Sequence, residues 1–288
     1  MKDSRALIDL IELTPIDPQT FVGHSISVGS EAVFGGQVMA QALNAAYRTV
    51  SADRHCHSLH SYFILRGDLS QPITYKVQLV RDGGSFTTRY VTAEQNDQAI
   101  FVLAASFQIE EEGLAFQDKM PDVPLPDELL SWEDVYAQSK DFLPKNMQTF
   151  LSVERPIHFK PTVLPNPFEK KDLEPIHHIW FQFKEYEKDT SFPHFHQLLA
   201  YVSDYNILMT SLRPHASEAH FGNMQLASLD HAIWFHRKPA NPSDWFLYTT
   251  NVLSNSNARG LASGQIYCSQ GNLIASVVQE GLMRKLAK

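Results

Sequence analysis

One arrangement of segments occurs twice in this chain: a helix-forming segment accompanied by strand-forming segments joined through short turns. In the first half, residues 33–50 are rich in glycine and alanine and have the pattern of a helix that packs closely against a sheet. Four strand-like segments follow, separated by turn signals at 82–84 and 96–97, and span residues 57–66, 73–82, 85–95 and 98–112. Consecutive strands with short connections form an antiparallel meander, so we expect a sheet wrapped around one helix.

The second half shows the same elements around a helix expected at residues 196–214. Its strand-like segments span residues 155–163, 177–185, 224–237, 244–254, 256–270 and 271–284, with a hairpin turn at 270–272. His60 to Arg66 aligns with His231 to Arg237 at an offset of 171 residues, and Arg89 aligns with Arg259 at 170. These matches predict a duplication and an α+β fold with two fused repeats.

The proline-rich stretch between the halves predicts the domain boundaries. Pro121, Pro124 and Pro126 interrupt the strand pattern, and a short helix is expected from about Trp132. We therefore expect an N-terminal repeat at residues 1–119, a linker at 120–153 and a C-terminal repeat at 154–288.

Composition and charge restrict the class of protein. Hydrophobic residues make up 43% of the 288 residues and charged residues 19%, which predicts a packed core. The net charge of -8 argues against broad nucleic-acid binding. Asp9 and Glu12 interrupt the apolar run near the N-terminus, so neither a signal peptide nor stable membrane insertion is expected. With only Cys56 and Cys268, a reducing, cytoplasmic location fits the sequence.

Asp204 is the most informative single residue of the second helix. Ser203, Asn206 and Thr210 form a polar stripe, whereas Asp204 falls nearly opposite, among apolar side chains. A buried carboxylate needs a partner or its pKa rises, and such groups are candidates for functional sites. A structural Asp that caps a loop or pairs with an Arg is the alternative.

Gly35 and Gly36 stand before the first helix and have two interpretations. Their free backbone N–H groups could face a ligand oxygen at the helix start, or the glycines could simply allow close packing.

Other motifs point away from common enzyme classes. The sequence contains no Gly-x-Ser-x-Gly elbow, phosphate-binding loop or dinucleotide-binding motif. His57 and His60 are three residues apart and would face opposite sides of a strand, so they cannot share a metal. We interpret the pairs His177-His178 and His194-x-His196 as solvated or loop residues. Five basic residues could bind phosphate groups of a ligand, although a surface ion pair is favoured for each: Arg66, Arg89, Arg237, Lys238 and Arg259.

Several longer motifs resemble the acyl-CoA thioesterase II family, and the resemblance extends from about Phe21 to Arg284. The motifs are FGGQ at 34–37, HSLHSYF at 57–63, DGGSF at 82–86, LDHAIWFHR at 229–237 and VQEG at 278–281. The resemblance implies a double hotdog fold, in which two fused copies of a long helix are each wrapped by an antiparallel sheet.

The resemblance also implies a mechanism in which water attacks the thioester. The family's Asp, hydroxyl residue and Gln fall on Asp204, Ser228 and Gln279, and Ser in place of Thr is within the family pattern. The chemistry of the residues agrees: an ionised Asp204 can act as a general base, and the Ser228 hydroxyl can donate and accept. Gln279 shares a strand face with apolar residues and needs a polar partner. The first half lacks an equivalent set, so one reaction centre per chain is expected.

The sequence therefore predicts an enzyme of fatty acid metabolism that hydrolyses acyl-CoA to free fatty acid and CoA, with no metal or other cofactor. A catalytically silent acyl-CoA-binding protein and a hotdog enoyl-CoA hydratase or dehydratase are the alternatives. Hydratase chemistry usually needs an Asp beside a His, and no His pairs convincingly with Asp204 in the sequence. The family resemblance further implies a homo-oligomer, either a dimer or a tetramer.

Overall fold

A continuous antiparallel sheet of 13 strands forms most of the computed structural model, which describes residues 1–143, 145–164, 171–220 and 222–286. The remaining residues, 144, 165–170, 221 and 287–288, fall within the predicted linker and second repeat but outside the described part. The strands are β1 (Thr14–Asp17), β2 (Thr20–Gly23), β3 (Arg54–Phe63), β4 (Ile73–Asp82), β5 (Phe86–Gln95), β6 (Gln98–Ile109), β7 (Ile157–Pro161), β8 (Ile176–Phe183), β9 (Met224–Ser228), β10 (Asp230–Phe235), β11 (Phe246–Ser256), β12 (Arg259–Cys268) and β13 (Leu273–Lys285).

The two halves of the chain meet in the middle of this sheet. The strand order is β1-β2-β4-β5-β6-β3-β10-β13-β12-β11-β8-β7, and β9 pairs with β13. β3 and β10 pair antiparallel with Leu59 opposite Ile233, so the meander of one half continues directly into that of the other. The expected helix-and-meander repeats are therefore present, joined edge to edge.

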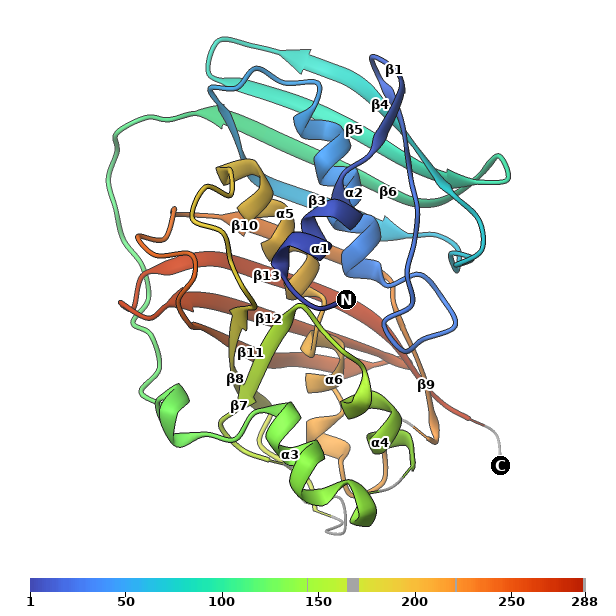
Figure 1. Ribbon diagram of the computed structural model, residues 1–288, viewed down its shortest axis with the longest axis vertical. Coiled ribbons are helices and arrows are strands. Elements are labelled where there is room, and N and C mark those ends of the chain that lie inside the picture. The colour runs from blue at the N-terminus through green and yellow to red at the C-terminus, as the bar shows by residue number, and fades with distance from the viewer. Residues whose placement is uncertain (144, 165–170, 221, 287–288) are drawn as a thin grey trace.

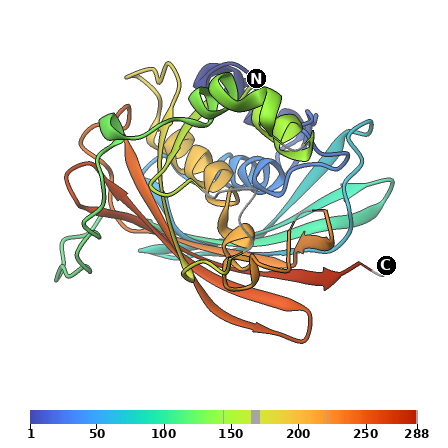
Figure 2. The ribbon, with the colours of Figure 1, turned by 90° about the horizontal axis from the view of Figure 1, so that it is seen from below.

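Two helices fill the concave side of the sheet. Figure 2 shows α2 (Gly35–Tyr47) and α5 (Phe192–Ser203) between the sheet and an outer group of helices. Both are buried along nearly their whole length, as their small and apolar residues predict. The other helices are α1 (Ser4–Ile11), α3 (Trp132–Ser139), α4 (Lys145–Ser152), α6 (Ile207–Thr210) and the 3-10 turns η1 (Pro126–Glu128), η2 (Lys140–Phe142) and η3 (Arg213–His215). Within the described ranges, no helix is both long and apolar enough to cross a bilayer.

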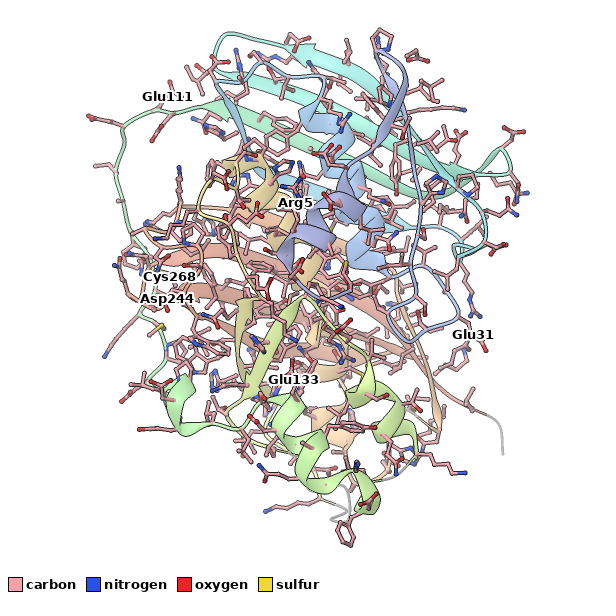
Figure 3. All side chains as sticks on the ribbon, viewed as in Figure 1. Arg5, Glu31, Glu111, Glu133, Asp244 and Cys268 are labelled. Atoms are coloured by element: carbon pink, nitrogen blue, oxygen red, sulfur yellow. The ribbon has the colours of Figure 1, made fainter. Side chains whose placement is uncertain are left out.

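The outer helices are attached to the second half of the chain. Arg5 on α1 lies 3.4 Å from Glu187, and Glu133 on α3 accepts a hydrogen bond from Lys184 at 2.7 Å (Figure 3). Because Arg5 and Glu133 are substantially exposed, packing contributes more than these ion pairs. α3 begins at Trp132, as predicted, and this ring packs on Phe159 of β7 with centroids 4.4 Å apart.

Two detailed sequence predictions are wrong. The match of His60 to His231 joins residues from opposite faces of the sheet, since His60 is exposed and His231 is fully buried. The repeats are therefore real as elements but differ in residue register. His177 and His178 were expected to be solvated or in loops but lie in β8, and His196 is buried within α5.

Candidate active site

Asp204 lies where α5 ends, rather than in the middle of a long helix. The expected helix at residues 196–214 is broken after Ser203: Asp204 is the C-cap, and Asn206 adopts a left-handed conformation with φ of 68° before α6 begins. Asn tolerates this conformation better than most residues. The break turns the Asp204 carboxylate toward the start of α2, in the other half of the chain.

The glycines at the start of α2 bring that helix against the carboxylate. The Gly36 N–H donates to Asp204 Oδ2 at 2.9 Å. A Cβ at Gly35 would lie 2.7 Å from the same oxygen, and one at Gly36 would collide with the Tyr201 carbonyl. The glycines thus allow close packing, and the backbone N–H of Gly36 at the start of the helix binds Asp204. The partial positive charge of the helix start also favours an anionic partner.

Ser228 and Gln279 complete a cluster with Asp204. The Gln279 side-chain N–H donates to Ser228 Oγ at 2.8 Å, and the Ser228 hydroxyl donates to Asp204 Oδ1 at 3.4 Å. Gln279 is 1% exposed and shares the inward face of β13 with apolar neighbours, as expected, whereas Asp204 and Ser228 are only partly buried. All three residues selected from the sequence therefore meet at one place.

A β-bulge places Ser228 in this cluster. Residues 224–237 were expected to form one strand, but the chain shifts register near Leu229: Ser228 of β9 opposes Gly281, whereas Ala232 of β10 opposes Val278. In a regular strand, residues three apart face opposite sides of a sheet. The bulge turns both Ser228 and His231 inward, a local distortion often found beside active sites.

The environment of Asp204 makes its carboxyl group a stronger base than an exposed one. Burial raises the pKa of Asp204 above its ordinary value, against the opposing effects of His231 and of hydrogen bonds from Gly36, Gln279 and Ser228. Burial dominates because desolvation penalises the charged form, while the donors limit that penalty. Such a group can accept a proton from a bound water near neutral pH.

His231 is the polar member of the cluster that the sequence did not indicate. It is fully buried, its Nδ1 contacts Gln279 Oε1, and its Nε2 lies 3.0 Å from Ser203 Oγ. Burial lowers its pKa, so the ring is neutral at physiological pH. No direct hydrogen bond between His231 and Asp204 is found among the described residues, and the ring reaches the carboxylate through Gln279 and Ser228. In a regular strand, His231 would face the opposite side of the sheet from Ser228. The bulge that turns both inward is not visible in the sequence, so nothing there indicated that His231 joins the cluster.

Aromatic rings form a wall beside the carboxylate. Phe34, just before α2, packs on Tyr201 and Tyr205 with centroids 5.2 and 4.7 Å apart. Tyr205 in turn contacts Phe159 at 5.2 Å. Aromatic rings therefore cover this side of the site, and the lower local dielectric strengthens its hydrogen bonds.

The basic residues considered as possible ligands of phosphate groups form other contacts. Arg89 is 2% exposed and bonds Asp82 and Thr49, so it is structural. Arg66 pairs with Glu31, and Arg259 pairs with Glu280. Among the described residues, no group of three or more His, Cys, Asp or Glu side chains could hold a metal ion.

Comparison with known proteins identifies the family. A family model described as acyl-CoA thioesterase matches residues 147–282, and one described as the acyl-CoA thioesterase N-terminal domain matches residues 24–108. The chain is 37% identical to acyl-CoA thioesterase 2 of Haemophilus influenzae over 278 residues, 96% of each chain. The solved structure of acyl-CoA thioesterase II TesB2 from Mycobacterium marinum matches 98% of both chains at 31% identity with a TM-score of 0.78.

The fold is also shared with a more distant protein. A conserved protein with hot dog fold from Alicyclobacillus acidocaldarius matches 98% of this chain and 99% of its own with a TM-score of 0.75 at 17% identity. The predicted double hotdog fold is thus confirmed. Together with the residues that align to the family motifs, these matches show that the chain belongs to the acyl-CoA thioesterase family.

Proposed function

We propose that this protein hydrolyses acyl-CoA to free fatty acid and CoA with a water molecule activated by Asp204. Membership of the acyl-CoA thioesterase family supports the reaction. The observation that supports the mechanism is the hydrogen-bonded cluster of Asp204, Ser228 and Gln279, in which the carboxylate has a raised pKa and remains partly accessible.

In this mechanism, water bound between Asp204 and Ser228 attacks the thioester carbonyl carbon. Asp204 takes one proton of the water as the carbon–oxygen bond forms. The tetrahedral intermediate then collapses, the carbon–sulfur bond breaks, and the departing CoA thiolate takes the proton from Asp204. The acid keeps the water oxygen and CoA leaves as the thiol, so no metal or covalent intermediate is required.

Gln279 orients the hydroxyl that positions the water. Its side-chain N–H occupies a lone pair of Ser228 Oγ, which directs the Ser228 hydrogen toward Asp204. The Asp204 carboxylate then accepts a hydrogen bond from a water in the cluster, and the Ser228 hydroxyl, whose orientation is fixed, contacts the same water. Such positioning places the nucleophile before the reaction begins.

Release of free thiol from a panel of acyl-CoA chain lengths tests the proposal. We expect turnover by the wild type and a loss of about 100-fold or more in Asp204→Asn, which keeps the size of the side chain but removes the base. Turnover that survives in the variant would move the base elsewhere. Tight acyl-CoA binding without thiol release would favour the silent binder, and loss of the enoyl double bond with the thioester intact would favour the hydratase.

We also propose the following organisation: repeats at residues 1–119 and 154–288, a linker at 120–153, a cytoplasmic location and a homo-oligomer. Limited proteolysis should cut first within 120–153, and sedimentation velocity should give a dimer or tetramer. Early cleavage inside a strand, or a monomer at micromolar concentration, would contradict these proposals. Subcellular fractionation that recovers the protein with membranes would contradict the location.

A further inference from the structure

The Gln279 carboxamide has two ends that must be told apart before its role is defined. Its oxygen accepts hydrogen bonds and its nitrogen donates them, yet the two ends have nearly the same shape. One end faces Asp204 and Ser228, and the other faces the imidazole of His231. The chemistry of these neighbours therefore decides which end is which.

Asp204 fixes the orientation of the amide. A carboxylate only accepts hydrogen bonds, and the Asp204 carboxyl group lies on the Ser228 side of the amide. The end toward Asp204 must then be the N–H end, which also donates to Ser228 Oγ at 2.8 Å. The reversed amide would direct its carbonyl oxygen at the carboxylate. Gln279 Oε1 consequently faces His231 Nδ1 and needs a donor there.

We infer that His231 is a positioning residue for Gln279, and that it acts as the neutral tautomer with the proton on Nδ1. The ring donates this proton to Gln279 Oε1, which keeps the amide N–H directed at Ser228 and Asp204. This inference rests on the proposed function, because it concerns the residues proposed to hold the water.

The other side of the ring fits the same tautomer. With the proton on Nδ1, Nε2 is an acceptor, and Ser203 Oγ lies 3.0 Å from it at the end of α5. The Ala200 carbonyl, 2.9 Å from Ser203 Oγ, is a second acceptor for the same Ser203 hydrogen. Donors thus follow one direction from His231 through Gln279 and Ser228 to Asp204. A chain of this kind ends on the carboxylate that takes the proton of the water.

Nitrogen-15 NMR of the wild-type protein labelled at histidine tests the tautomer without any assay of activity. We expect the His231 ring to be neutral at pH 7.5, with its proton on Nδ1 and with the shift of an unprotonated nitrogen at Nε2. The resonances should disappear in His231→Asn, which assigns them. Protonation at Nε2, or at both nitrogens, would overturn the inference.

Steady-state kinetics test the consequence. His231→Leu leaves Gln279 Oε1 without its donor, so we expect kcat to fall about 10- to 100-fold with little change in KM. His231→Asn keeps an N–H near the Nδ1 position and should stay within about fivefold of wild type. His236→Leu, an exposed residue of the same strand segment bonded to Ser276, is the matched control and should leave kcat unchanged.

The outcomes separate the inference from the proposed function. Equal losses in His231→Leu and His231→Asn would mean that the ring only packs, which overturns the positioning role. Asp204→Asn measured in parallel reports on the base alone. Full turnover in Asp204→Asn would contradict the proposed mechanism. In that case the NMR measurement of the His231 tautomer would still test the chain of donors.

Discussion

The helix pair has two ends of similar construction, and the cluster of Asp204, Ser228 and Gln279 lies at one of them. At the first end, the α2 N-terminus has no side-chain cap of its own and receives Asp204 from α5. At the second end, Ser191 caps the α5 N-terminus from within its own segment. The α2 C-terminus there carries Tyr47 and Arg48 where α5 carries Ser203 and Asp204.

The side chains of the second end form structural contacts. Arg48 pairs with Glu12, and the Tyr47 hydroxyl contacts His196 Nδ1 at 2.7 Å and accepts from the Cys56 N–H at 2.9 Å. Burial lowers the pKa of His196 to about 3, so this ring stays neutral. The inward face of β6 offers no amide to match Gln279, because it carries Leu103, Ala105 and Phe107. The two halves of the chain thus supply two similar helix ends, and the Asp204 carboxylate on the start of α2 distinguishes the first.

The largest effect is expected from a methyl group at the first end. In Gly35→Ala, the new Cβ would lie 2.7 Å from Asp204 Oδ2 and 2.8 Å from Phe63, so the carboxylate must shift from its position in the cluster. We expect kcat/KM to fall about 100-fold, since small misplacements of catalytic groups are costly. Gly84→Ala, which meets nothing within 4 Å, is the control. Equal activity of both variants would show that the position of Asp204 is unimportant.

Ser228 comes next in expected effect. Removal of its hydroxyl in Ser228→Ala should lower kcat about 10- to 100-fold, because the water loses a positioning partner. Ser228→Thr retains the hydroxyl and should stay within about fivefold of wild type. Thiol release under saturating acyl-CoA provides the comparison, and an alanine variant as active as the threonine variant would exclude a role for the hydroxyl.

The raised pKa of Asp204 has consequences for activity and stability. The base must be ionised, so kcat/KM should fall as the pH drops through a value above the ordinary 3.8 of Asp. For stability the sign is opposite: the folded protein binds the proton more tightly than the unfolded chain, so stability is lost as pH rises from about 3.8 through the raised pKa. Asp204→Asn should therefore gain Tm relative to wild type as the pH rises. A constant Tm difference between pH 3.5 and 7.5 would contradict the shift.

The smallest effect on activity is expected at the second end. Tyr47→Phe removes the oxygen that accepts from the Cys56 N–H, which should cost about 1–3 kcal/mol of unfolding free energy. Activity should nevertheless remain within about twofold of wild type, because Asp204, the proposed base, lies at the other end. Urea unfolding and thiol release on the same preparation measure both quantities. A loss of activity comparable to that of Ser228→Ala would show that the two ends are coupled.

Local patterns in the sequence predicted the elements better than their interruptions. The meander strands β4, β5 and β6 begin and end close to the expected positions, because alternation and turn residues are local signals. The break at Asn206 was missed because no Gly or Pro marks it, and the bulge near Leu229 was missed because a bulge depends on the partner strand.

The site shows the same limit. Asp204 was singled out by the pattern of its helix, and Ser228 and Gln279 by the family resemblance, but the Gly36 N–H that binds Asp204 belongs to a residue 168 positions away. Such a contact depends on the packing of α2 against α5 and has no local signature. The role of Gly35 and Gly36 was accordingly left open between a ligand and packing.

The most direct test of the mechanism is a single turnover in water enriched in oxygen-18, with enzyme in excess over acyl-CoA. If Asp204 activates water, the fatty acid from this first turnover carries the heavy isotope at one oxygen and the protein carries none. An attack by the carboxylate itself would form an acyl anhydride at Asp204, and water attack at its protein carbonyl would leave the heavy isotope in the Asp204 side chain. Mass spectrometry of the product and of the peptide containing Asp204 distinguishes the two results, and label in the peptide would contradict the proposed mechanism.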